Sequence, residues 1–366
     1  MSKLSKNQVD DMIRRLDMHP IDFEERINTL DKPLIIESAC PGWQPKYWGP
    51  RKIYPAKPPG YTGEGDERFP AVPISIEEQK RDIVEAVKLG AQCIHFHPRD
   101  PEIGIALEFT ERNAPLMAEL LKLAFKEISD TITLQHTWTA SGGSPKNLAE
   151  EQTQTLARAG LDGISDTRML LELGHGNKYC QGAVVLWPPG DAYPPGYTDN
   201  IQDTIRFFED NEVKPIHKLR SSYNVRKLKR VLIDTEVITK KPFILVHDMG
   251  HPFGWPMDID RWMPIDMIAS LEQTKERIPD SVIGVYSGGR NWMPITMTAI
   301  LAGVDLIRVG IEDCYWMYPH RDDIIQSNSQ VVKLIIDFAN MVGRPLATVE
   351  QAREIMGMKL TSANVA

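Results

Sequence analysis

A pair of histidines one residue apart is the clearest chemical feature of the sequence. His95 and His97 stand in the run IHFHPRD, residues 94–100. Because side chains alternate along a β-strand, both imidazoles would point to the same side and could reach one Zn²⁺ ion at about 2.0–2.1 Å. The alternative is two polar side chains that hydrogen-bond to neighbouring backbone groups. The spacing therefore indicates a metal site, and further ligands must decide between the two interpretations.

A second group of charged residues lies near the end of an apolar run, in LIRVGIED, residues 306–313. On a strand, Arg308 and Glu312 share one face, and a buried charge is costly unless it is paired or ligated. Glu312 with the two histidines would give a His₂Glu ligand set, which leaves one position open for water or substrate. Asp313 would lie close enough to pair with Arg308. The alternative is an Arg–Glu–Asp ion-pair network without a metal.

Weaker candidates surround these groups. Arg99 and Asp100 follow the histidines directly and are predicted to hold them by hydrogen bonds, although a loop salt bridge fits equally well. Thr137 and Ser165 each close an apolar run, and we expect them to contact substrate.

Eight short apolar runs alternate with amphipathic segments, and they must position these residues. The runs span 33–39, 93–97, 131–137, 163–165, 213–217, 243–247, 282–286 and 306–311. Strands that alternate with helices indicate parallel βαβ units, and eight of them at this length predict a closed (β/α)8 (TIM) barrel. An open doubly wound sheet is the rival, but no G-x-G-x-x-G follows the first strand.

Two long loops follow predicted strands, at 41–73 and 174–199. In a barrel both would lie at the C-terminal mouth, where active sites are built. We expect residues 1–30 to form an amphipathic N-terminal extension and residues 31–366 to form a single barrel domain with C-terminal helices.

Composition excludes several other classes of protein. The chain has 366 residues, a net charge of −8 and 42% apolar residues, which argues against a basic nucleic-acid binder and against intrinsic disorder. The N-terminus lacks the apolar core of a secretory signal, and no apolar stretch is long enough to span a bilayer. The four cysteines show no paired spacing. We therefore expect a cytoplasmic protein with reduced thiols and no membrane or nucleic-acid partner.

Taken together, these motifs resemble the β-keto acid cleavage enzyme family, whose best-known activity is 3-keto-5-aminohexanoate cleavage. The similarity covers about residues 33–358 and includes PLIIESACPG, GAQCIHFHPRDP, IRVGIED and GRPLATVEQAREIMG. It implies a zinc-bearing (β/α)8 barrel, usually a homotetramer, that converts a β-keto acid and acetyl-CoA to acetoacetate and a new acyl-CoA. His95, His97 and Glu312 match the family's zinc ligands, with one Zn²⁺ per chain. Arg308 and Asp313 match its catalytic pair.

The sequence departs from the family pattern at positions that contact substrate. Gln44 replaces an acid of members that handle an amino-bearing substrate, and His217 and Lys218 stand where an acid ends the fifth strand. Thr137 replaces a serine, and Cys314 replaces an asparagine. Because exchanging a carboxylate for an amide or a base changes which charged substrate is tolerated, we expect a substrate other than 3-keto-5-aminohexanoate.

Two other functions fit the same residues. A zinc-dependent hydrolase or aldolase on this barrel would use a bound hydroxide and no CoA. A metal-bearing binding protein would need to have lost its catalytic acid, which the presence of Arg308 and Asp313 argues against.

Overall fold

A computed structural model describes most of the chain. The described residues are 4–17, 28–40, 72–101, 112–136, 151, 154–165, 205–219, 222–249, 263–314 and 316–359. The predicted mouth loops therefore lie largely outside the described residues, as do Gln44 and Thr137.

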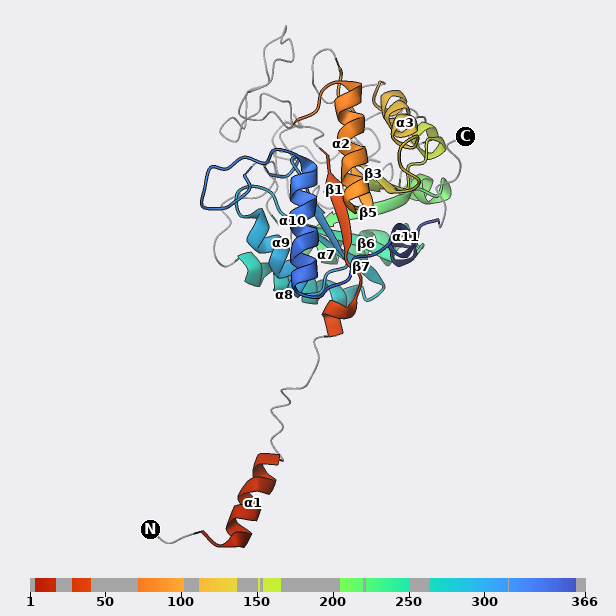
Figure 1. The fold of residues 1–366 in the computed structure, drawn as a ribbon. Coiled ribbons are helices and arrows are strands. Elements are labelled where there is room, and N and C mark those ends of the chain that lie inside the picture. The colour runs from red at the N-terminus through yellow and green to blue at the C-terminus, as the bar shows by residue number, and fades with distance from the viewer. Residues whose placement is uncertain are drawn as a thin grey trace, which may run out of the picture.

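Eight parallel strands form a closed barrel in chain order (Figure 1). They are β1 (Ile35–Ala39), β2 (Cys93–His95), β3 (Ile132–His136), β4 (Gly163–Ser165), β5 (Lys214–Leu219), β6 (Phe243–Asp248), β7 (Ser281–Tyr286) and β8 (Leu306–Val309). The last strand pairs with the first, with Ile35 opposite Leu306 and Glu37 opposite Arg308. This pairing confirms the (β/α)8 prediction and excludes the open doubly wound sheet.

Helices surround the barrel (Figure 1). Those described around it are α2 (Ile76–Leu89), α3 (Asn113–Ala124), α7 (Ser222–Leu228), α8 (Met263–Arg277), α9 (Trp292–Leu301), α10 (Asn328–Met341) and α11 (Val349–Met356). A further helix, α1 (Lys6–Asp17), precedes the barrel in the chain. Shorter helical turns lie at Asn28–Asp31 and Lys229–Ile233. Ser75 opens α2 with a capping box, in which its hydroxyl accepts from the Glu78 amide and Glu78 accepts from the Ser75 amide. Among the described helices, none is both long and apolar enough to cross a membrane. The division into an extension and one barrel domain stays a prediction.

The alternation of side chains along the strands separates two buried apolar layers. Ile35, Cys93 and Leu306 belong to a cluster inside the barrel. Ile307 and Val309 instead pack with α9 and α10 on the outside. The inner face of a strand is therefore the face of Ile35 on β1 and of Leu306 on β8. Glu37 and Arg308, two residues further along, continue those inner faces toward the mouth.

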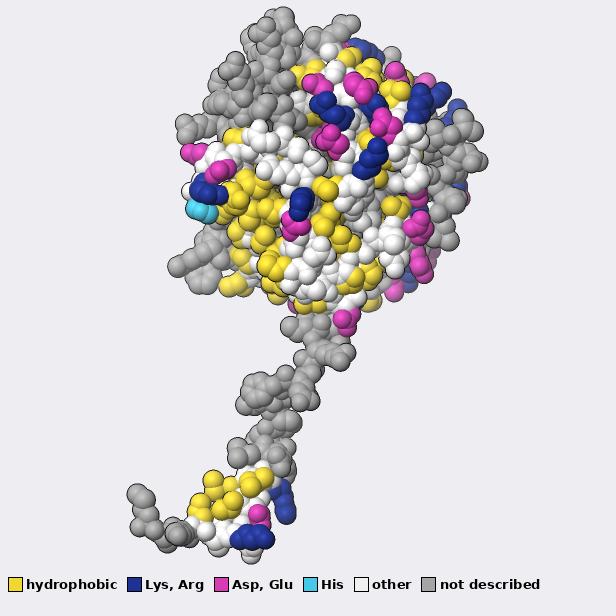
Figure 2. All heavy atoms as spheres, viewed as in Figure 1, with side chains coloured by type: hydrophobic (Ala, Val, Ile, Leu, Met, Phe, Trp, Pro, Cys, Tyr) yellow, Lys and Arg dark blue, Asp and Glu magenta, His cyan; other side chains and the backbone are white. Residues whose placement is uncertain are grey.

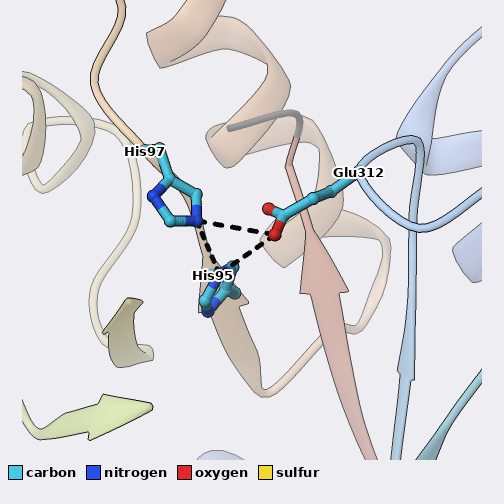
Figure 3. A group of neighbouring side chains, drawn as sticks. All are labelled: His95, His97 and Glu312. Atoms are coloured by element: carbon cyan, nitrogen blue, oxygen red, sulfur yellow. Dashed lines mark hydrogen bonds and ion pairs between the residues drawn. The ribbon is translucent and has the colours of Figure 1, made fainter. Parts of the chain in front are cut away.

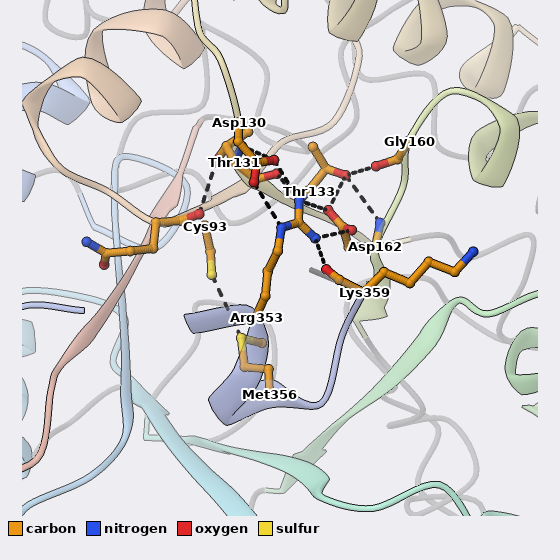
Figure 4. Close-up of polar contacts among 10 residues, drawn as sticks. Cys93, Asp130, Thr131, Thr133, Gly160, Asp162, Arg353, Met356 and Lys359 are labelled. Carbon is orange, nitrogen blue, oxygen red and sulfur yellow. Dashed lines mark hydrogen bonds and ion pairs between the residues drawn. The ribbon is translucent and has the colours of Figure 1, made fainter. Parts of the chain in front are cut away.

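The N-terminal face of the barrel is closed by the guanidinium of Arg353, on α11 (Figure 4). This fully buried side chain pairs with Asp130 before β3 (Nη2–Oδ1 2.9 Å) and with Asp162 before β4 (Nη1–Oδ1 2.6 Å). It also donates to the Thr131 carbonyl. A cavity of about 300 Å³ opens beside it, lined by Asp162, Lys214 and Lys359 among others, at the end of the barrel away from the histidines.

Two strands end two residues earlier than the sequence pattern predicts. The predicted runs 93–97 and 306–311 are shortened to β2, which ends at His95, and β8, which ends at Val309. The chain leaves β8 at Gly310, where a Cβ would lie 2.2 Å from the Ala39 carbonyl oxygen. Glycine thus allows the ends of β1 and β8 to approach, and the residues after it turn over the mouth of the barrel.

Candidate metal centre and active site

Three potential metal ligands meet at the mouth of the barrel (Figure 3). One ligand atom from each of His95, His97 and Glu312 lies within 4.8 Å of the others, and all three residues are buried. Figure 3 shows the carboxylate of Glu312 turned toward both imidazole rings. The structure therefore brings together the three residues that the sequence nominated, although their role as ligands stays a prediction.

The spacing of these atoms fits a single small cation. Nε2 of His95 lies 3.1 Å from Nε2 of His97, and each of these nitrogens lies 3.5 Å from Glu312 Oε1. Three atoms each about 2.0–2.1 Å from a tetrahedral Zn²⁺ would be about 3.3 Å apart. The donor set, two nitrogens and one oxygen, is also one that zinc accepts in catalytic sites.

Local structure explains how the three side chains reach one point. His95 ends β2, and His97 follows two residues later in the extended chain, so both side chains face the same way. Glu312 lies in the turn after β8. Two backbone amides of that turn donate hydrogen bonds that fix it: the Ile311 amide donates to Asn328 Oδ1 at 2.8 Å, and the Glu312 amide donates to the Ala39 carbonyl at 3.4 Å.

The charge states suit metal binding. Burial, with Arg308 nearby, lowers the pKa of His95 well below its ordinary value, so this imidazole is neutral at neutral pH. Burial alone would raise the pKa of Glu312, but the Arg308 guanidinium and the two imidazoles outweigh it and hold that pKa well below the usual range. A neutral imidazole and an ionised carboxylate are the forms that bind a cation.

Arg308 and Asp313 form a buried two-point ion pair beside the three ligands. The Arg308 Nε donates to Asp313 Oδ2 and Nη2 donates to Oδ1, each at 2.9 Å, while Nη2 also reaches Glu312 Oε1 at 2.8 Å. The guanidinium lies over the ring of Tyr286, 4.9 Å from its centroid. Burial raises the pKa of Asp313 even though Arg308 opposes the shift, which makes the carboxylate a stronger base than an exposed aspartate.

Glu37 is a site residue that the sequence analysis missed. It lies on the inner face of β1, is 3% exposed, and places Oε1 3.6 Å from His95 Nδ1 and 3.7 Å from Arg308 Nη1. Burial raises its pKa to about 7, against the opposing effect of Arg308 and Lys218. The available signal was an acid at the inward position of an otherwise apolar strand.

Lys218 and His217 are adjacent on β5 and face opposite ways. Ile216 packs inside the barrel and Leu219 packs outside, so alternation places Lys218 inside and His217 outside. The Lys218 Nζ lies 5.1 Å from the centroid of the Tyr286 ring, and its charge acts on both Glu37 and Asp313. Of the two, the structure brings Lys218 toward the site and not His217.

The contacts of the remaining predicted site residues say less about the chemistry of the site. Asp100 accepts a hydrogen bond from Arg112 at 2.5 Å, which matches the loop salt bridge that the sequence left open. Arg99 is fully buried, and its backbone exchanges hydrogen bonds with the side chain of Gln79. Ser165 closes β4, and its side chain lies outside the described residues, as do Gln44 and Thr137.

Comparison with known proteins connects this geometry to a family. The model of the beta-keto acid cleavage enzyme family matches residues 60–358. The chain is 25% identical to the 3-keto-5-aminohexanoate cleavage enzyme of Acetoanaerobium sticklandii, over 80% of this chain and 93% of that one. It is 23% identical to the 3-dehydrocarnitine:acetyl-CoA trimethylamine transferase of Rhizobium meliloti, over 82% and 94% of the two chains.

Solved structures show the same fold. The ternary complex of ObcA with a C4-CoA adduct and oxalate superposes with a TM-score of 0.58 at 16% identity, over 79% of this chain and 68% of that chain. The apo form of ObcA gives a TM-score of 0.56. With a family model that covers most of its length and a buried His–His–Glu cluster at the barrel mouth, the chain belongs to the β-keto acid cleavage enzyme family.

Proposed function

We propose that this protein is a zinc-dependent β-keto acid cleavage enzyme, which converts a β-keto acid and acetyl-CoA to acetoacetate and a new acyl-CoA. The observation that carries the proposal is the meeting of His95, His97 and Glu312 beside the Arg308–Asp313 pair. A metal-free ion-pair network would not need the two histidines, and a simple binding site would not need the Arg308–Asp313 pair.

The metal ligands, Asp313 and Arg308 each have a separate role in the proposed reaction. When bound by His95, His97 and Glu312, one Zn²⁺ per chain would supply Lewis acidity and a template for the two oxygens of the keto acid. Asp313 removes the proton from the carbon between the two carbonyl groups. Arg308 fixes the direction of that carboxylate through two parallel hydrogen bonds. The resulting carbanion attacks the acetyl-CoA thioester and expels the CoA thiolate. That thiolate then adds to the original keto carbon of the substrate, and cleavage of the adjoining C–C bond releases the new acyl-CoA and acetoacetate, which takes back the proton.

Acetyl-CoA is proposed as the co-substrate by likeness to relatives. The name of the Rhizobium meliloti relative, 3-dehydrocarnitine:acetyl-CoA trimethylamine transferase, includes acetyl-CoA, and ObcA has been solved with a C4-CoA adduct. A hydrolase or aldolase that does without CoA is the competing outcome, and the fate of the thioester separates them.

We further propose that the substrate carries a neutral or anionic chain beyond the keto group. Lys218 lies on the inner face of β5, where its ammonium acts on Glu37 and Asp313. A cationic chain entering the same mouth would meet this ammonium without water to screen it. Gln44, Thr137 and Ser165 remain proposed substrate contacts, with Arg99 and Asp100 as supports of the histidines.

A homotetramer is proposed as the assembly. Figure 2 shows hydrophobic side chains gathered on the surface over α9 and the neighbouring edge of α10. Leu301 on α9 is 48% exposed and Met341 on α10 is 74% exposed, and a contiguous exposed apolar patch of this kind marks a protein–protein interaction site. Light scattering after gel filtration tests this: the mass should be that of four chains, and a mass of one or two chains would contradict the proposal.

Metal analysis tests the ligand set. The His97→Ala protein should lose zinc, because two remaining ligands bind zinc far more weakly than three. His320→Ala removes an exposed histidine and serves as the control, which should keep the wild-type zinc content. Full zinc occupancy in a folded His97→Ala protein would rule out this ligand set.

A further inference from the structure

Glu37 occupies a central position inside the barrel that the catalytic scheme above does not use. Its neighbours in the sheet register are Cys93 on β2 and Arg308 on β8. Its side chain shares the inner face of β1 with Ile35, which packs in the barrel interior. The carboxylate is therefore enclosed between the strand that carries His95 and the strand that carries Arg308.

Two buried nitrogen atoms lie near one oxygen of this carboxylate. Within the part of the chain that the structure describes, His95 Nδ1 and Arg308 Nη1 are both buried and lack a hydrogen bond. Both lie just beyond hydrogen-bond distance of Glu37 Oε1, at 3.6 and 3.7 Å. A buried donor without an acceptor is destabilising, so a small shift of the carboxylate toward either group is favoured.

The orientation of His95 gives this contact its chemical meaning. Its Nε2 faces His97 and Glu312, so a metal there requires a free electron pair on Nε2 and places the ring proton on Nδ1. That proton points toward Glu37. Carboxylates that accept such a proton from a ligating histidine fix the tautomer and the ring orientation, and they raise the basicity of the ligand.

We propose that Glu37 is a positioning residue, whose carboxylate holds His95 in the Nδ1–H tautomer and braces Arg308 through Nη1. The inference rests on the proposed metal function of His95. It links the metal ligands to the Arg308–Asp313 pair through one side chain. Arg308 places Nη1 3.7 Å from Glu37, while it donates to Glu312 from Nη2 and to Asp313 from Nε and Nη2.

A purely structural role makes different predictions. If Glu37 only balances the charge of Arg308, its replacement by the isosteric glutamine lowers stability and leaves His95 and the metal unaffected. If it positions His95, Glu37→Gln loses the charge-assisted hydrogen bond to Nδ1, and zinc affinity falls about 10–100-fold. Glu37→Asp keeps the charge on a shorter side chain and should recover part of that affinity.

The first measurement is the zinc dissociation constant from competition with a chromogenic chelator. It is made for the wild type, Glu37→Gln, Glu37→Asp and the control Glu119→Gln, which alters an exposed acid on α3. We expect the order wild type and control tightest, Glu37→Asp intermediate and Glu37→Gln weakest. Equal affinity in all four proteins would overturn the proposal.

The second measurement reads the tautomer directly and needs no metal. In ¹⁵N-histidine-labelled apo protein, with His95 assigned from the spectrum of His95→Gln, the wild type should carry its proton on Nδ1 with a downfield, hydrogen-bonded shift. Glu37→Gln should move this resonance, and an unchanged spectrum would overturn the proposal even if zinc affinity changed. A wild type that binds no zinc yet shows the predicted tautomer would contradict the metal function and leave the positioning role standing.

Discussion

Arg308 and Asp313 are joined by two parallel hydrogen bonds of 2.9 Å, across a turn that begins where β8 ends. Both side chains are almost fully buried. A guanidinium held in this way cannot rotate without breaking both bonds, so the direction of the Asp313 carboxylate is fixed before substrate arrives.

We expect Asp313→Asn to lower kcat by about 10²–10⁴-fold, the usual contribution of a general acid–base group. Arg308→Ala should lower kcat by a similar factor, because the Asp313 carboxylate is then no longer held in one direction. Both variants should retain zinc, since the Asn change leaves all three ligands and the Arg change removes a positive charge beside the cation. Steady-state rates and metal content of the same samples give the answer. Near-wild-type turnover in either variant would make the pair purely structural.

Lys218 should determine which chain beyond the keto group the enzyme prefers in its substrate. The wild type should prefer plain-alkyl or anionic β-keto acids over one with an amine at C5. Lys218→Glu should shift the ratio of kcat/KM toward the amino compound by about tenfold to a hundredfold, because a charge-assisted hydrogen bond contributes about 1.5–3 kcal/mol.

Lys218→Met serves as the control for that test, because it removes the charge without adding a carboxylate. It should give an intermediate ratio. A wild type that prefers the amino compound by tenfold or more would contradict the charge argument, including the substitution at Gln44.

Arg353 should be important for stability and not for the chemistry. Arg353→Leu leaves Asp130 and Asp162 without their buried partner, and breaking such a pair costs about 3–5 kcal/mol in the free energy of unfolding. Lys333→Met removes an exposed ion pair with Asp337 on α10 and should change stability by less than about 0.5 kcal/mol. Urea denaturation followed by circular dichroism compares the two. A similar midpoint for both variants would contradict this assignment.

His247 should give the protein a specific dependence of stability on pH. It is buried between the hydroxyls of Ser270 and Thr274, and burial lowers its pKa to about 4. Unfolding restores a pKa of about 6.5, so the unfolded chain binds the proton first as the pH falls. The stability contributed by the neutral imidazole is complete above that value and is lost progressively toward pH 4.

The free energy of unfolding that this group contributes is large enough to measure. Between pH 7 and pH 5 the wild type should lose about 2 kcal/mol through this group. Denaturation of His247→Gln at both pH values should lack that component, while other titrating groups contribute equally to both proteins. An identical pH dependence in the two proteins would show that His247 is not protonated on unfolding.

Much of the fold could be predicted because parallel strands buried on both faces leave a continuous apolar signal. The ends of strands were less predictable. Glu312 was expected on the inner face of a strand through residue 311, yet β8 ends at Val309 and a turn brings Glu312 to the histidines. The approach of Gly310 to Ala39, which allows that turn, is a contact between residues far apart in sequence.

The roles of individual side chains were harder to predict than the ends of strands. His217 and Lys218 were grouped as substrate contacts, although neighbours on one strand cannot both face the barrel interior. Glu37 was passed over because one acid within an apolar strand has no motif. Its significance depends on His95 and Arg308, which only the closed barrel brings to either side of it.

Acyl exchange at a His–His–Glu metal centre is tested most directly by isotope tracing. The zinc-loaded protein is incubated with a plain-alkyl β-keto acid and [1,2-¹³C₂]acetyl-CoA, and the products are followed by ¹³C NMR, with His97→Ala as the control. We predict that the label enters acetoacetate while the remainder of the keto acid becomes attached to CoA, and that His97→Ala forms neither product. Label recovered as free acetate, or consumption of the keto acid with the acetyl-CoA untouched, would contradict the account.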